Sequence, residues 1–157
     1  MVSIPEIVKK ELRIGNIREA NRIQGFPYSL QGIVIKGNKL GRTLGFPTAN
    51  IEPSRNTPLY LVNGVYAVYA KLNGRCYKGV TNIGTRPTLN INQLSIEVNL
   101  IDFDEDIYGK TITLFFIERI RDEIKFPGFD ALKEQIRIDK DTAERLLRTV
   151  YNPDTCP

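Results

Sequence analysis

The chain has 157 residues, 41% of them hydrophobic, which is enough for one compact domain with a core of its own. No stretch approaches the roughly 18 apolar residues that a membrane span needs, so a cytoplasmic protein without a membrane partner is expected. Histidine is absent, which excludes Ser-His-Asp and Cys-His catalysis and favours a carboxylate as any general base. A metal site would have to use oxygen ligands, which are typical of Mg²⁺ or Ca²⁺.

Charge is divided unevenly along the chain. Residues 1–78 hold 12 Lys and Arg against 4 Asp and Glu, whereas residues 79–157 hold 10 against 14. A basic first half suits an anionic ligand such as a nucleotide phosphate or a nucleic-acid backbone, although scattered solvated lysines give the same count. Cys76 and Cys156 provide neither a disulfide framework nor the spacing of a zinc site, so two reduced structural thiols are expected.

The hydrophobic pattern predicts helices at both ends of the chain and strands between them. Two short helices are predicted over residues 5–24, and Gly25 and Pro27 then end helix formation. Short β-rich segments follow at 32–35, 64–70, 76–83, 94–100 and 111–120. Their spacing, with an Asn73-Gly74 hairpin turn, predicts an antiparallel sandwich or barrel. A closing helix is indicated by the apolar stripe of Phe129, Leu132, Ile136, Ala143, Leu146 and Val150.

Residues 36–50 form the most unusual segment of the sequence. Glycines recur every four residues with cations between them, as Gly37, Lys39, Gly41, Arg42 and Gly45. Glycines let the backbone fold tightly around phosphates, although a flexible turn has the same composition and the Walker pattern is absent. In an extended segment Thr48 and Asn50 point the same way, so their oxygens could share one Mg²⁺. A turn in which both bond to their own backbone is the alternative.

Two charged positions stand out among the predicted strands. Strict alternation over residues 95–100 places Glu97 on the polar face of a half-buried strand, where most glutamates are simply solvated. Glu97 is nevertheless a positioned carboxylate in a chain without histidine. Arg121 follows the last long strand, where a guanidinium suits an anion or a planar ring. Ordinary ion pairing with Asp122 and Glu123 is the alternative.

Taken together, these segments resemble the flavokinase (riboflavin kinase) family. The resemblance covers roughly residues 28–150, in the family's order. It is carried by Gly41 to Asn50, Gly64-Val65-Tyr66, Asn82 to Thr88, Glu97 with Leu100 to Phe103, Tyr108-Gly109-Lys110 and Arg121 to Phe126. It implies a mainly β fold: a six-stranded antiparallel Greek-key β-barrel with a C-terminal helix packed on it and a short N-terminal helical extension.

The same resemblance implies a Mg²⁺-dependent kinase that transfers the ATP γ-phosphate to the ribityl 5′-hydroxyl of riboflavin, giving FMN. Carried over by position, Glu97 would be the catalytic base, and Thr48 and Asn50 would hold Mg²⁺. Asn99 stands where many relatives have histidine, which leaves the proposed base intact.

Substrate binding is assigned in the same way. Gly37, Arg42 and Thr48 would bind the nucleotide, and Arg121 would lie beside the flavin. The implied partners are ATP and riboflavin, with no nucleic acid, and a monomer is expected.

The resemblance also divides the chain into three parts. Residues 1–26 look like the closing helices of the nucleotidyltransferase domain in bacterial bifunctional FAD synthetases, residues 27–151 like the kinase domain, and residues 152–157 like a tail. The rest of the nucleotidyltransferase domain has no counterpart in these 157 residues, so adenylylation of FMN is not expected.

Two other functions fit parts of the sequence. A flavin-binding sensor would keep the pocket without the chemistry, but it would need neither metal ligands nor a base. An OB-like barrel that binds nucleic acid would need exposed aromatic side chains for base stacking. Tyr66, Tyr69 and Tyr77 are available, but they lie in segments that read as core strands.

Overall fold

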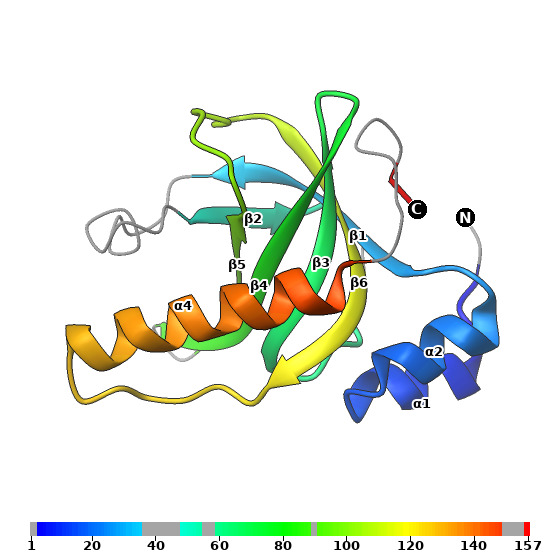
Figure 1. Cartoon of the computed structure of the whole chain (residues 1–157). Helices are drawn as coiled ribbons and strands as arrows, with labels where there is room; N and C mark the ends of the chain where they lie inside the picture. The colour runs from blue at the N-terminus through cyan, green and yellow to red at the C-terminus, as the bar shows by residue number, and fades with distance from the viewer. Residues whose placement is uncertain (1–2, 36–47, 55–58, 89–90, 149–155) are drawn as a thin grey trace.

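Six antiparallel strands close into a barrel in the order β1-β2-β5-β4-β3-β6 (Figure 1). The computed structural model describes residues 3–35, 48–54, 59–88, 91–148 and 156–157. The strands are β1 (Tyr28–Ile35), β2 (Ala49–Pro53), β3 (Gly64–Leu72), β4 (Arg75–Thr88), β5 (Ile91–Leu100) and β6 (Thr111–Arg121). Consecutive strands β3, β4 and β5 are neighbours and β2 lies beside β5, which is the Greek-key order. The predicted six-stranded Greek-key barrel is confirmed.

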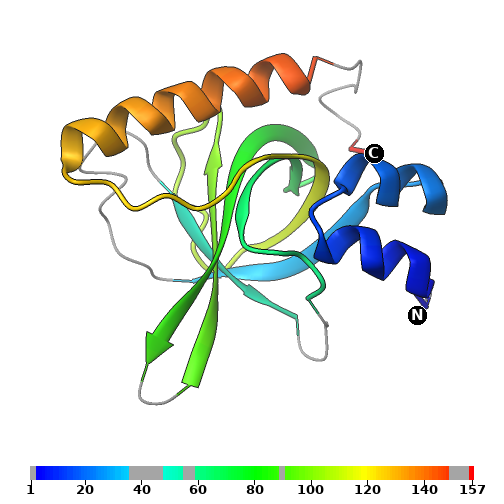
Figure 2. The same cartoon turned by 90° about the horizontal axis from the view of Figure 1, so that it is seen from below.

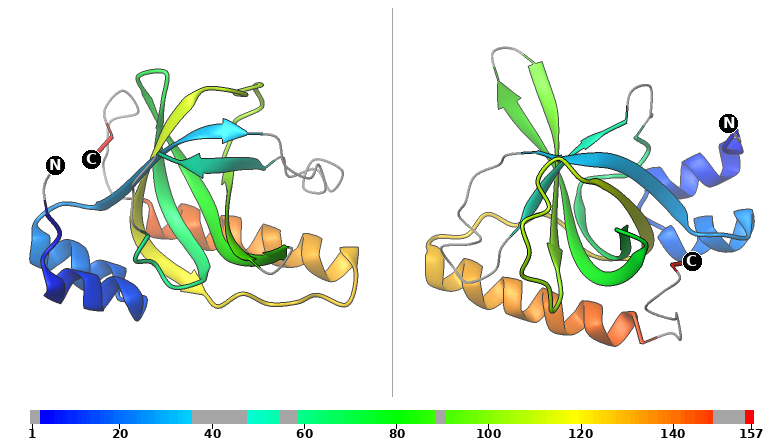
Figure 3. Two further views of the ribbon diagram at one scale, coloured as in Figure 1. Left: turned by 180° about the vertical axis from the view of Figure 1, so that it is seen from behind. Right: turned by 90° about the horizontal axis from the view of Figure 1, so that it is seen from above.

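Helices cover two sides of this barrel. The described helices are α1 (Glu6–Arg13), α2 (Ile17–Gln24) and α4 (Phe129–Leu146). Figure 2 shows α4 along one flank, with α1 and α2 together on another, and Figure 3 shows the same arrangement from two further sides. The predicted N-terminal helical extension and C-terminal helix are both confirmed. In the described part of the chain, no helix is long and apolar enough to cross a membrane.

Strand β3 is buried on both faces, and this explains how α4 attaches. Its inward side chains, including Tyr66 and Val68, belong to the main core of the barrel. Its outward side chains Ala67 and Tyr69 form a second buried cluster with residues of α4 and its C-cap. The Tyr69 hydroxyl donates a 2.6 Å hydrogen bond to the carbonyl of Leu147. The end of α4 is therefore fixed to the outer wall of the barrel.

The first residue of the expected apolar stripe on α4 does not pack. Phe129 is 62% exposed, so this part of the expectation is wrong. The reason is positional: Phe129 is the first residue of the helix, and the packed face starts one turn later with Leu132, which borders the pocket described below.

The N-terminal helices share the core of the barrel. Val8 and Leu12 of α1 and Ala20 of α2 are fully buried and belong to the same hydrophobic cluster as the inward strand residues. Asn21 adds a polar bridge, since its Nδ2 donates to the carbonyl of Phe116 at 2.8 Å and its Oδ1 accepts from the amide of Tyr28 at 2.9 Å. The two helices are therefore integrated into the barrel through both apolar packing and hydrogen bonds.

The turn between β3 and β4 follows the sequence prediction. Asn73 and Gly74 both have positive φ angles, 52° and 77°, as the central residues of a type I′ hairpin turn require. Asparagine and glycine tolerate this region better than other residues, so the local sequence sets the register of the β3–β4 hairpin.

The cysteines correct an expectation. Cys76 and Cys156 are joined in a disulfide with their Cα atoms 5.1 Å apart, so the expectation of two reduced thiols is wrong. The two are separated by 80 residues, and nothing in their spacing indicates that residues beyond α4 return to β4. Both lie partly buried against the outer cluster under α4, and this packing brings the sulfurs together.

Candidate active site

A single row of cross-strand neighbours links most of the predicted site residues. Asn50 of β2 pairs with Glu97 of β5, which pairs with Asn82 of β4. Asn82 pairs in turn with Val65 of β3, which pairs with Arg121 at the end of β6. Directly opposed residues of antiparallel strands present their side chains on the same face, about 4.5–5.5 Å apart at Cα. Asn50, Glu97 and Arg121 therefore lie along one line across the outer wall of the barrel.

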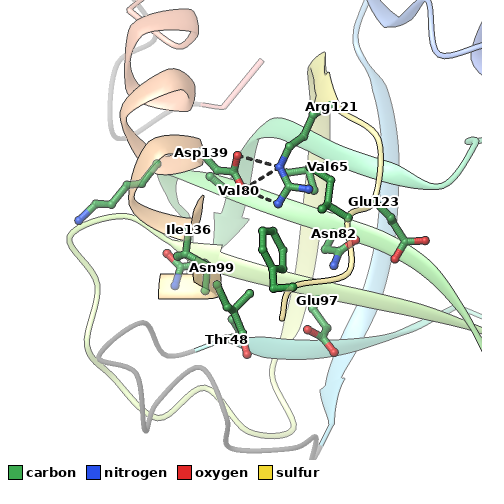
Figure 4. A pocket seen from close by; sticks show the side chains of 14 residues that line it. Thr48, Val65, Val80, Asn82, Glu97, Asn99, Arg121, Glu123, Ile136 and Asp139 are labelled. Atoms are coloured by element: carbon green, nitrogen blue, oxygen red, sulfur yellow. Dashed lines mark hydrogen bonds and ion pairs between the residues drawn. The ribbon is translucent and has the colours of Figure 1, made fainter. Parts of the chain in front are cut away.

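A pocket of ≈ 220 Å³ opens over this row (Figure 4). Its floor consists of four residues of the row, Glu97, Asn82, Val65 and Arg121, and of the adjacent pair Asn99 and Val80. Its other wall comes from the segment after β6 and from α4, through Glu123, Ile124, Phe126, Leu132, Ile136, Asp139 and Lys140. Figure 4 shows Thr48 and Glu97 on one side of the pocket and the Arg121–Asp139 pair on the opposite side.

Arg121 is held by a buried carboxylate. Its Nε and Nη2 donate to both carboxylate oxygens of Asp139 at 2.7–3.1 Å, and its Nη1 donates to the carbonyl of Asp122 at 2.9 Å. The guanidinium also lies 5.8 Å from the ring centre of Phe126, within cation–π range. The sequence left open an ordinary ion pair between Arg121 and Asp122. In the structure Asp122 pairs with Arg119 instead, at 2.7 Å.

Glu123 approaches the barrel wall at Gly84. A Cβ atom at residue 84 would lie 2.6 Å from Oε2 of Glu123, so any side chain there would displace the carboxylate. Gly84 belongs to the Asn82 to Thr88 segment that carried part of the sequence resemblance. Its lack of a side chain lets the segment after β6 pack against β4 and close the edge of the pocket.

Oxygen atoms suited to a magnesium ion occur at the Thr48 side of the pocket. Thr48 lines the pocket with a hydroxyl, and Asn50 is a polar residue only 8% exposed, next to Glu97 in the ladder. Mg²⁺ prefers oxygen ligands and commonly takes one or two from the protein while substrate phosphates and water supply the rest. Within residues 3–35, 48–54, 59–88 and 91–148, no cluster of three or more Asp, Glu, Cys or His side chains offers a complete protein cage. The residues present therefore fit a metal that is shared with a phosphate ligand.

The structure brings together Thr48, Glu97 and Arg121 in one pocket and places Asn50 beside Glu97. Glu97 is half-buried, with Ile96 and Val98 facing the core, as the strand alternation predicted. Gly37 and Arg42, expected to bind the nucleotide, lie outside the described residues.

Sequence reasoning missed two pocket residues that the structure reveals. Asn82 belongs to a segment that carried the resemblance, but its place beside Glu97 follows only from the pairing of β4 with β5. Asp139 could have been noticed in the sequence. It lies three residues after Ile136 and four before Ala143, which is the spacing of the apolar stripe. A charged residue at a position where the apolar stripe requires a buried side chain indicates a buried ion pair.

The three strand tyrosines that the sequence offered for base stacking are buried or packed against other side chains. Tyr66 is fully buried and Tyr69 is 3% exposed. Tyr77 packs edge-on against Phe103 with ring centres 4.9 Å apart. These three tyrosines therefore form no stacking platform of the kind that the OB-like alternative would need.

Comparison with known proteins identifies related sequences. The family model for flavokinase, described as riboflavin kinase, matches residues 24–147. The bifunctional riboflavin kinase/FMN adenylyltransferase of Bacillus subtilis is 47% identical over 141 residues, covering 88% of this chain and 44% of the relative. The protein of the same name from Haemophilus influenzae is 46% identical over 143 residues, covering 90% of this chain and 46% of the relative. The chain thus spans less than half the length of these relatives.

Solved structures share the fold. Riboflavin kinase from Trypanosoma brucei superposes with a TM-score of 0.55 at 25% identity, covering 78% of each chain. A Streptococcus pneumoniae structure named as a macrolide-efflux protein superposes with a TM-score of 0.85 at 33% identity, covering 90% of this chain and 47% of that one.

Proposed function

Because this chain belongs to the riboflavin kinase family, we propose that it transfers the γ-phosphate of ATP to the ribityl 5′-hydroxyl of riboflavin. The observation that carries this proposal is the row of cross-strand neighbours from Asn50 through Glu97 to Arg121. It places a candidate metal ligand, Asn50, beside a candidate base, Glu97, and the base shares one pocket with a candidate flavin contact, Arg121. Phosphoryl transfer depends mainly on such alignment and on charge neutralisation.

The pocket suits a planar, largely apolar ring at its Arg121 side. Val65, Val80, Phe126 and Ile136 give that part of the pocket apolar walls. The Arg121–Asp139 pair adds hydrogen-bonding groups whose charges already balance each other. An isoalloxazine ring placed there would direct its ribityl chain along the row toward Glu97.

Glu97 is the proposed general base. The 5′-hydroxyl oxygen of riboflavin attacks the γ-phosphorus of ATP, and its proton passes to the Glu97 carboxylate. The bond between the γ-phosphorus and the β–γ bridging oxygen breaks, and ADP leaves. A positioned carboxylate is the residue type available for this step in a chain without histidine.

Thr48 and Asn50 would hold Mg²⁺ through a hydroxyl and an amide oxygen. When bound, the ion would neutralise the negative charge on the transferring phosphates. Gly37 and Arg42 are proposed to contact the rest of the nucleotide, on the strength of the family resemblance. The position of Asn50 directly opposite Glu97 in the ladder supports its part in this assignment.

The proposal is tested by incubating the chain with riboflavin, ATP and Mg²⁺ and separating riboflavin, FMN and FAD by chromatography. FMN formation that stops when Mg²⁺ is chelated is the expected result. Riboflavin fluorescence that is quenched on binding, without any FMN, would reject the kinase in favour of the flavin sensor.

A further inference from the structure

Asp139 is a buried carboxylate on the barrel-facing side of α4. It is 3% exposed and lies between Ile136 and Ala143 on the packed face of the helix. Withdrawing a carboxylate from water is unfavourable unless a positive charge and hydrogen-bond donors surround it. An apolar side chain at this position would continue the stripe of the helix, so packing alone does not explain the aspartate.

The Asp139 carboxylate accepts hydrogen bonds from Arg121 and from Gln135. Its Oδ1 accepts from Nε of Arg121 at 2.9 Å and from Nε2 of Gln135 at 2.9 Å, and its Oδ2 accepts from Nη2 of Arg121 at 2.7 Å. The fork of Arg121 thus meets the carboxylate with two nitrogens, which fixes the plane of the guanidinium. Gln135, one turn earlier on α4, fixes the carboxylate in turn.

This arrangement orders Arg121 before any ligand arrives. Arginine has a long side chain that loses rotamer freedom when it is immobilised, and a site that is already ordered avoids this loss on binding. Because Asp139 also compensates its charge, Arg121 is suited to an uncharged planar ring more than to a phosphate. Both properties come from α4, an element that lies outside the barrel and contributes no base or metal ligand.

We propose that Asp139 is a positioning residue that holds Arg121 in place for the flavin ring and thereby sets the affinity for riboflavin. It leaves the phosphoryl-transfer step unaffected, because Glu97 and Thr48 lie on the opposite side of the pocket. The assignment of the ligand as a flavin rests on the proposed kinase function.

The first test compares Asp139→Asn with Asp141→Asn in steady-state kinetics. Asp141 lies on the exposed face of the same helix and pairs with Arg137 at 3.0 Å, so it is a matched control. Asp139→Asn is expected to raise the KM for riboflavin by about tenfold or more while kcat and the KM for ATP change less than about twofold. Asp141→Asn is expected to leave all three constants unchanged. A fall in kcat with an unchanged KM for riboflavin would overturn the proposal.

A second set of variants separates positioning from folding. Replacing the whole pair, as in Arg121→Met with Asp139→Leu, avoids an unpaired buried charge and is expected to keep the melting temperature near that of the wild type. This double variant should bind riboflavin about tenfold or more weakly, measured by fluorescence quenching. In the Arg121→Met background, Asp139→Asn should add less than about a twofold effect, because Asp139 acts through Arg121. A folded double variant with wild-type affinity for riboflavin would overturn the proposal.

Riboflavin binding is measured without ATP, so this test does not depend on catalysis. If the wild type binds riboflavin but makes no FMN, the kinase proposal fails while the comparison of affinities still decides the role of Asp139. If the wild type neither binds riboflavin nor makes FMN, both proposals fail.

Discussion

Asn50 of β2 and Glu97 of β5 are direct cross-strand partners, next to the pair Ala49 and Val98. This pairing closes the barrel between two segments 47 positions apart in the sequence, and it places an amide oxygen beside a carboxylate. A metal bound at Asn50 and a proton acceptor at Glu97 would thus act on neighbouring atoms of the same phosphoryl transfer.

Glu97→Gln should slow FMN formation by about 10²–10⁴, the usual contribution of a general base, because glutamine keeps the shape and cannot accept the proton. Riboflavin binding by fluorescence quenching should persist. Glu105→Gln, at an exposed loop position, is the control for loss of one negative charge. Near-normal turnover of Glu97→Gln would remove Glu97 from the mechanism.

Asn50→Ala should raise the Mg²⁺ concentration needed for half-maximal FMN formation by about tenfold or more, since the loss of groups around a metal typically weakens it by roughly 10–100-fold. The measurement is a Mg²⁺ titration at saturating riboflavin and ATP. Asn99→Ala, on the neighbouring row of the pocket floor, serves as the comparison. Equal shifts in both variants would indicate a general loss of pocket structure instead of a metal ligand.

Leu12→Ala in α1 should lower the free energy of unfolding by about 2–5 kcal/mol, because Leu12 is fully buried in the core cluster of the barrel. Ile14→Ala removes a side chain that is 60% exposed and should cost less than about 0.5 kcal/mol. Chemical denaturation monitored by circular dichroism measures both. A Leu12→Ala variant as stable as Ile14→Ala would show that the N-terminal helices do not stabilise the barrel.

Stability should fall at high pH through Tyr28. Burial raises the pKa of Tyr28 to about 12 from its ordinary value of 10. The folded state therefore retains the phenol proton over a range in which the unfolded state loses it. The resulting stabilisation is complete below pH 10 and is lost as the pH rises toward 12, with a change of roughly 1–3 kcal/mol.

Unfolding experiments between pH 8 and about 12 check this expectation, with Tyr28→Phe as the control that cannot titrate. The variant should lose stability less steeply over the upper part of the range. Burial also raises the pKa of Tyr66, so some pH dependence should remain in the variant. Identical slopes in the two proteins would exclude a contribution from Tyr28.

Reduction of the Cys76–Cys156 disulfide should lower the free energy of unfolding by roughly 2–4 kcal/mol, because the bond closes a loop of 80 residues and restricts the unfolded chain. Unfolding is compared with and without a reductant, and thiol titration verifies the state of the cysteines. Cys76→Ser should have the stability of the reduced protein and no response to reductant. Equal stability of both redox forms would contradict this account.

Local patterns in the sequence were sufficient for most of the secondary structure. Alternation with a period of two identified the strand that carries Glu97, and the Asn73-Gly74 pair identified the hairpin turn. These features depend on residues that are close together in the chain, so their physical causes are visible in the sequence. The order of the motifs also indicated the family. The family in turn implied the Greek-key barrel and the candidate roles of Thr48, Asn50, Glu97 and Arg121.

The sequence by itself thus determined the helices, all strands except β2, and the side chains that could carry chemistry. Only the tertiary structure decided that Asn50, Glu97 and Arg121 lie on one row, that Asp139 holds Arg121, and that Cys76 meets Cys156. Each of these contacts joins segments that are far apart in the chain. Their geometry depends on how the barrel closes and on how α4 packs on β3. A local sequence pattern contains no information about either, because both involve residues far apart in the chain.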